Sequence, residues 1–136
     1  MSEPASPTLL PEGLRDVLPP DAAGEADLVE RLAASFDLNG YDRVAPPLVE
    51  FESTLLAGMG AVTAARIFRM VDPISQRTLG IRADVTAQIA RLVSTRLQSA
   101  PRPLRLMYAG QVLRVKGHQL RPERQFTQVG FELVGP

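Results

Sequence analysis

The sequence lacks cysteine entirely and has no excess of either charge. Without cysteine there can be no disulfide, no thiolate metal site and no cysteine nucleophile, and the absence is compatible with a reducing compartment. Fifteen basic residues balance fifteen acidic ones, which argues against nonspecific nucleic-acid binding, because such binding needs clustered positive charge. No stretch approaches the roughly 20 apolar residues of a membrane span, and the N-terminus has no signal-peptide pattern. We therefore expect a soluble, cytoplasmic protein with no membrane contact.

The composition of the chain is that of one ordinary globular domain. The chain has 136 residues, of which 45% are hydrophobic and 22% charged, so it can bury a core. Residues 1–10 begin with a polar, proline-bearing stretch and are expected to form a disordered lead-in to a domain over residues 11–136. No internal repeat or low-complexity tract interrupts that domain.

The hydrophobic pattern predicts a mixture of helices and strands. One helix is predicted over residues 21–38, where apolar residues recur at helical spacing until Asn39-Gly40 supplies a stop. Another is predicted over residues 84–98, with a short helix between them near residues 53–56. Strand patterns cover residues 41–45, 67–71, 76–81, 104–115 and 124–134. The second and third strands are joined by the turn at residues 72–75 as a hairpin, and the last two are expected to be antiparallel neighbours. The fold class is thus α+β, with an antiparallel sheet flanked by helices.

Side-chain alternation groups several polar residues on the last two strands. One face of the last strand carries Gln128 and Glu132 with Gly130 between them, which resembles the floor of a pocket for a small polar ligand. On the neighbouring strand Arg114 shares a parity with Tyr108, Gly110 and Val112, and an arginine and a glutamate flanking a cavity can bind a zwitterion at both ends. The opposite face, taken as the core face, consists of Thr127, Val129, Phe131 and Leu133. A solvated strand face with a glycine bulge is the alternative.

Asp84 and Thr86 stand at the start of the predicted helix over residues 84–98. They fit equally as a helix cap with its first-turn residue and as contacts for a ligand ammonium group. His118 lies in a polar loop with no cysteine, histidine or carboxylate at ligand spacing, so we predict neither a metal site nor a catalytic residue there. Phosphate-binding glycine loops, nucleophile elbows and paired catalytic carboxylates are absent from the sequence.

Four segments resemble a known family much more specifically than these spacings. GIRADVTAQIAR (residues 80–91) is similar to the segment of histidyl-tRNA synthetases that contacts histidine, and MYAGQVLRVKGHQLRPERQFTQVGFELVG (107–135) resembles class II motif two. GLRDVLPPDA (13–22) and GYDRVAPPLVEFESTLL (40–56) resemble the start and the motif-one region of that family. The resemblance implies the N-terminal portion of a class II aminoacyl-tRNA synthetase-like domain, with motif three absent. A chain of this extent is expected to be a fragment or to depend on a partner.

The resemblance also implies which residues bind a ligand. Asp84, Thr86 and Gln128 would surround the α-amino group of bound histidine. Arg114 would be the motif-two arginine, near a carboxylate or phosphate, and Glu132 the acidic residue on the floor of the histidine pocket. Strand parity had already grouped Arg114, Gln128 and Glu132 on one face.

At two places the sequence departs from the synthetase pattern, and these departures indicate which branch of the family the chain resembles. Synthetases carry a glutamate two residues after the motif-two arginine to help hold ATP, whereas Lys116 reverses the charge there. Where synthetases read arginine, proline, glutamate, this chain reads Arg82-Ala83-Asp84. Both changes are similar to the synthetase paralogues that regulate the short form of ATP phosphoribosyltransferase.

Resemblance to that branch implies a noncatalytic regulatory subunit acting in the first step of histidine biosynthesis. Its partner would be the short-form catalytic subunit in a hetero-oligomer, its effector L-histidine, and its self-contact a homodimer through the motif-one region, with no cofactor. Two alternatives stay open: a truncated or divergent histidyl-tRNA synthetase that activates histidine with ATP, and a structural scaffold whose pocket is vestigial.

Overall fold

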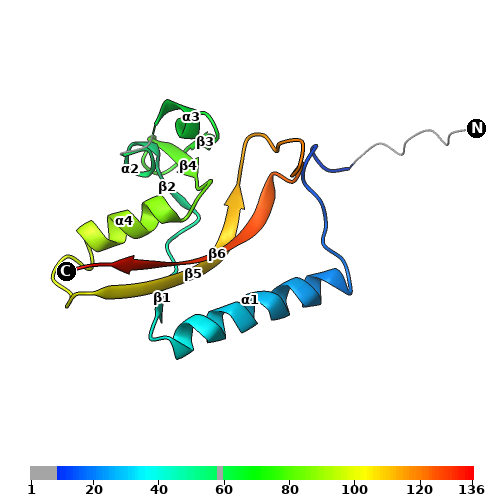
Figure 1. Ribbon diagram of the computed structural model, residues 1–136. Helices are drawn as coiled ribbons and strands as arrows, with labels where there is room; N and C mark the ends of the chain where they lie inside the picture. The colour runs from blue at the N-terminus through cyan, green and yellow to red at the C-terminus, as the bar shows by residue number, and fades with distance from the viewer. Residues whose placement is uncertain (1–8, 58–59) are drawn as a thin grey trace, which may run out of the picture.

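The computed structural model describes residues 9–57 and 60–136, and a long two-stranded hairpin forms its centre (Figure 1). Strands β5 (Leu104–Leu113) and β6 (Gln125–Val134) pair antiparallel along their whole length. Strand β1 (Asp42–Arg43) adds to β5 in parallel, giving the order β1-β5-β6. The two long predicted strands are confirmed, whereas the strand predicted over residues 41–45 is reduced to two residues before the prolines. Most of the predicted lead-in, residues 1–8, lies outside the described residues.

A second, smaller sheet has the antiparallel order β2-β4-β3, from Val49–Phe51, Thr78–Ile81 and Phe68–Val71. The predicted hairpin is confirmed, and its turn is held by the Asp72 carboxylate, which accepts hydrogen bonds from the Ile74 amide at 3.1 Å and the Ser75 hydroxyl at 2.6 Å. Strand β2 was not predicted, because three residues show no periodicity and its partner β4 is distant in sequence. Two short helices, α2 (Glu52–Leu55) and α3 (Ala61–Ala64), complete this part, and only α2 was predicted.

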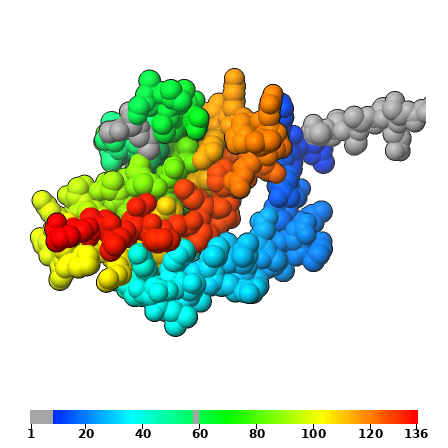
Figure 2. Space-filling model, viewed as in Figure 1, coloured from blue at the N-terminus to red at the C-terminus, as the bar shows by residue number. Residues whose placement is uncertain are grey.

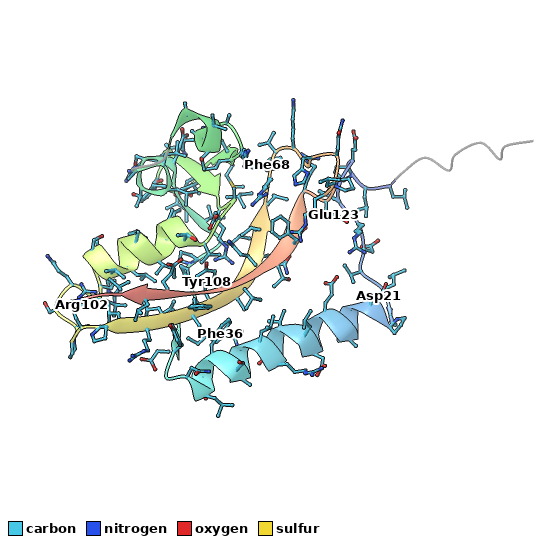
Figure 3. The ribbon with its side chains drawn as sticks, in the orientation of Figure 1. Asp21, Phe36, Phe68, Arg102, Tyr108 and Glu123 are labelled. Carbon is cyan, nitrogen blue, oxygen red and sulfur yellow. The ribbon has the colours of Figure 1, made fainter. Side chains whose placement is uncertain are left out.

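Helix α1 (Asp21–Leu38) lies along one side of the central hairpin, and helix α4 (Thr86–Ser94) lies along the other (Figure 1). Helix α1 has the predicted bounds and ends where Gly40 adopts a φ of +79°, a conformation that glycine reaches without strain. Figure 3 shows Phe36 of α1 facing the hairpin, where its ring centroid lies 4.9 Å from that of Phe131. No helix in the described part of the chain is long and apolar enough to cross a membrane.

Helix α4 is shorter than the predicted span of 84–98. It ends at Ser94, and Thr95 has left helical geometry with φ −121° and ψ −81°. The hydroxyls of Ser94 and Thr95 donate to the Arg91 carbonyl at 3.1 and 2.6 Å, and such side-chain hydrogen bonds compete with continuation of a helix. Hydrophobic periodicity extends past this point to Leu97, which explains the overestimate.

The main core lies on the α4 side of the hairpin, which contradicts the predicted core face. Its buried members come from α4, the residue before it and β5: Val85, Ile89, Leu106, Tyr108 and Val112. On β6 the face taken as core is the more exposed one, since Phe131 is 52% and Leu133 is 58% exposed. Figure 2 shows β6 at the surface between α4 and α1. Alternation separates two faces correctly but does not reveal which helix covers each of them more closely.

Candidate functional site

Gln128 connects β6 to the segment that leads into α4. Its Oε1 accepts a hydrogen bond from the Val85 amide at 2.9 Å, and its Nε2 donates to Asp84 Oδ1 at 3.2 Å. Both groups of the side-chain amide are therefore used, and they tie residues separated by more than forty positions in sequence. We call Asp84, Thr86, Tyr108, Gln128 and Glu132 the polar cluster.

Asp84 and Thr86 are the members of the polar cluster that lie at the start of α4. The Thr86 amide donates to Asp84 Oδ1 at 2.8 Å, but the N-cap of α4 is Val85 and carries no side-chain cap hydrogen bond, so the predicted capping role of Asp84 is not observed. Both hydrogen bonds to Asp84 use Oδ1, and no described residue donates to Oδ2. The Thr86 hydroxyl lies 3.4 Å from the Tyr108 hydroxyl. The Asp84 carboxylate thus holds the start of α4 and Gln128 through one oxygen only.

Tyr108 lies across β6 in the space that Gly130 leaves. The two residues are directly opposite in the hairpin, and a Cβ on Gly130 would be 2.5 Å from the Tyr108 hydroxyl oxygen. Figure 3 shows Tyr108 on the α4 side of the hairpin. Burial raises the pKa of the Tyr108 phenol, the hydrogen bond with Thr86 acts against this, and the charges of Glu132 and Asp84 raise it further. The phenol is therefore a neutral hydroxyl close to two carboxylates.

Arg82 occupies the second glycine gap, over Gly110. A Cβ on Gly110 would collide with Arg82 Nη2 and lie 3.2 Å from Cζ. The guanidinium is anchored by Nε, which donates to the Gln111 carbonyl at 2.7 Å, and by Nη1, which donates to the Pro46 carbonyl at 2.9 Å. The expectation that these glycines leave an empty floor is wrong, because Arg82 and Tyr108 fill both gaps.

Arg82 and Tyr108 are the two residues of this site that sequence reasoning did not identify. Gly130, opposite Tyr108, and Gly110, next to the Arg82 guanidinium, were the available signal, since a strand glycine often marks a close approach by another group. The parity argument read those glycines as free space. Only the packing of the segment 82–86 against the hairpin shows which side chains enter them.

Arg114 is not part of the polar cluster, which corrects the expectation that it and Glu132 flank one cavity. Glu132 faces Leu106 and Gln128 faces Gly110 across the hairpin. Arg114 therefore lies about 26 Å from the level of Glu132 and about 13 Å from that of Gln128, at roughly 3.3 Å per residue along the strand.

Arg114 instead lines a basic cleft of about 400 Å³ with Arg66, Lys116 and His118. Its guanidinium lies 5.0 Å from the centre of the Phe126 ring. His118 is exposed, and its Nδ1 accepts a hydrogen bond from the Leu120 amide at 3.3 Å. Within residues 9–57 and 60–136 no group of three histidine or carboxylate side chains could hold a metal ion.

The larger cavities lie elsewhere. One of about 680 Å³ separates α1 from the opposite face of β6 and is lined by Leu28, Leu32 and Val129 among others. Another of about 540 Å³ lies between Pro46-Pro47 and the end of α4. Neither is lined by a member of the polar cluster. The polar cluster thus presents two carboxylates beside a neutral phenol, an arrangement suited to a cationic group.

Comparison with known proteins gives one consistent result. The family model described as histidyl-tRNA synthetase matches residues 13–136. A relative from Rhodospirillum rubrum named ATP phosphoribosyltransferase regulatory subunit is 64% identical over 131 residues, covering 96% of this chain and 34% of the relative. One with the same name from Paramagnetospirillum magneticum is 62% identical over 135 residues, covering 99% of this chain and 36% of the relative. The chain spans about a third of the length of these relatives.

Solved structures agree with the fold. A structure from Bacillus halodurans described as an ATP phosphoribosyltransferase regulatory subunit/histidyl-tRNA synthetase matches with a TM-score of 0.77 and 34% identity, covering 98% of this chain and 33% of that one. Histidyl-tRNA synthetase from S. aureus matches with a TM-score of 0.71 and 25% identity, covering 91% of this chain and 28% of that one. The predicted class II synthetase-like fold is confirmed.

Proposed function

Because the chain belongs to the histidyl-tRNA synthetase family, we propose that it is part of a regulatory subunit of ATP phosphoribosyltransferase with no catalytic step of its own. The observation that carries this proposal is the high identity, over nearly the whole chain, to relatives that bear that name. The subunit would act in the cytoplasm, in the first step of histidine biosynthesis. Histidine would be its ligand and not its substrate.

The polar cluster is the proposed histidine site. Asp84, Thr86 and Gln128 would hold the α-amino group, with the unused Oδ2 of Asp84 available for a charge-assisted contact. Glu132 would receive the imidazole. Two carboxylates close to one neutral phenol support a ligand that carries positive charge. A role for Arg114 in histidine binding stays a prediction of the resemblance, since its position on the hairpin is remote from the other four.

Two protein partners are proposed. The first is the short-form catalytic subunit, in a hetero-oligomer, and the second is another copy of the chain through the motif-one region. That region, residues 40–56, directly follows α1 and contains β1, β2 and α2. Leu28 and Leu38 of α1 are 57% and 87% exposed, which supports a covering partner on that helix. Feedback requires histidine to bind one state of the assembly better than another, with a coupling of about 1–3 kcal/mol in typical systems.

The second candidate function is histidine activation by a divergent histidyl-tRNA synthetase. The similarity to solved synthetases favours it, while Lys116, exposed at the basic cleft, is opposite in charge to the glutamate expected of a synthetase. Histidine-dependent exchange of pyrophosphate into ATP by the intact protein would support this function. Absence of exchange would exclude it.

The decisive experiment measures ATP phosphoribosyltransferase activity of the short catalytic subunit, with and without the intact protein, across a histidine titration. We expect activation that histidine then inhibits. Activation without inhibition would leave only a scaffold role with a vestigial site. No effect on activity would contradict the regulatory proposal and return attention to the synthetase.

A further inference from the structure

The polar cluster contains charge for only one end of an amino acid. The carboxylates of Asp84 and Glu132 suit an ammonium and an imidazole, but they repel the α-carboxylate of a bound zwitterion. A cation is needed beside Gln128 to offset that repulsion. The backbone of Arg114 lies about 13 Å along the strand from the Gly110–Gln128 pair, at roughly 3.3 Å per residue, and its guanidinium lies over the Phe126 ring. Within β5 and β6 the only basic side chain is Arg105, which has the opposite parity.

Arg82 is the cation that the fold brings to this position. Its guanidinium lies where a Cβ of Gly110 would project, and Gly110 is directly opposite Gln128. Directly opposed side chains begin about 5 Å apart on the same face of a hairpin, so the guanidinium and the Gln128 amide are neighbours. Two residues further on, Asp84 contacts the same Gln128 at 3.2 Å. The segment 82–84 thus places the Arg82 guanidinium and the Asp84 carboxylate near the side-chain amide of Gln128.

We infer that Arg82 receives the α-carboxylate of the amino-acid ligand, an inference that rests on the proposed histidine site. Hydrogen bonds from Nε and Nη1 hold the guanidinium in place, and no described residue accepts from Nη2, which lies over Gly110. Arg82 is only 7% exposed, and burial lowers its pKa while the charge of Glu50 opposes this. A cation that has lost its water gains more from a ligand carboxylate than an exposed one does.

The test compares two ligands that differ only at the carboxylate. Isothermal titration calorimetry on the intact protein measures the affinities of L-histidine and of L-histidinol, which carries a hydroxymethyl group in place of the carboxylate. We expect the wild type to prefer histidine by about tenfold or more, as for a charge-assisted contact. Arg82→Met should reduce the preference to below about threefold. Arg114→Met and the matched control Arg105→Met should keep it.

Each outcome decides the question. A folded Arg82→Met protein that keeps the preference, loss of the preference in Arg114→Met, or equal binding of both ligands by the wild type overturns the role of Arg82 and leaves the histidine site intact. Binding of neither ligand contradicts the proposed function itself. If circular dichroism shows that Arg82→Met does not fold, Arg114→Met decides alone, because a retained preference supports Arg82 and a lost one excludes it.

Discussion

Replacing Gly130 with alanine is expected to lower the free energy of unfolding by about 1–3 kcal/mol, as typical for overpacking a core. The added Cβ would lie 2.5 Å from the hydroxyl oxygen and 2.7 Å from Cζ of Tyr108, closer than nonbonded atoms approach. Tyr108 is 5% exposed and belongs to the core cluster with Val85 and Ile89. The ring therefore cannot move aside without opening the contact between α4 and β5.

The assay is equilibrium unfolding by urea, with Gly24→Ala as the matched control. Gly24 lies in α1, where a new Cβ would meet nothing within 4 Å, so the same chemical change should stabilise by about 0.5–1 kcal/mol through helix propensity. The cost of Gly130→Ala should also fall when Tyr108 is already alanine, because the two changes share one contact. A Gly130→Ala protein within about 0.5 kcal/mol of wild type would refute the reasoning.

Three further predictions use the same protein. Glu132→Ala should weaken histidine binding by roughly 1.5–3 kcal/mol in calorimetry, as for loss of a charged hydrogen-bond partner, and an unchanged affinity would rule out the site assignment. The Ser75 hydroxyl and the Ile74 amide lower the pKa of Asp72 below 3.8, so its contribution to stability is present above pH 3.8 and lost as the pH falls through the lower folded value. An NMR titration midpoint at or above 3.8, or acid sensitivity unchanged in Asp72→Asn, would contradict this. Phe131→Ala should cost about 1–2 kcal/mol through its aromatic contacts, while Leu133→Ala should change stability by less than about 0.5 kcal/mol. Equal costs in urea unfolding would show that α1 does not cover Phe131.

Features governed by neighbouring residues were predicted well. Helix α1 was predicted with its observed ends, because the stop at Asn39-Gly40 depends on backbone freedom at a single residue. The turn at Asp72 was predicted from residues that bond to one another within four positions. The end of α4 was missed, because hydroxyl groups of Ser94 and Thr95 ended the helix while its apolar pattern continued.

The candidate site was predicted in part for a related reason. Resemblance and parity together selected Asp84, Thr86, Gln128 and Glu132, and the structure brings the first three together through hydrogen bonds or a shared contact with Tyr108. Parity also grouped Arg114 with them, since it records the face of a strand and ignores distance along it. Arg114 lies eight residues along the chain from Leu106, which faces Glu132, so their backbones are about 26 Å apart although they share one face.

The sequence by itself determined the elements, the pairing of the two long strands and the polar character of one face, because these depend on local backbone preference and on a period of two residues. Only the tertiary structure decided which face became the main core, and which side chains entered the spaces over Gly110 and Gly130. Those spaces are filled by Arg82 from a segment before α4 and by Tyr108 from the opposite strand. Contacts between segments far apart in sequence depend on how a helix docks on a sheet, and no single stretch of residues encodes that arrangement.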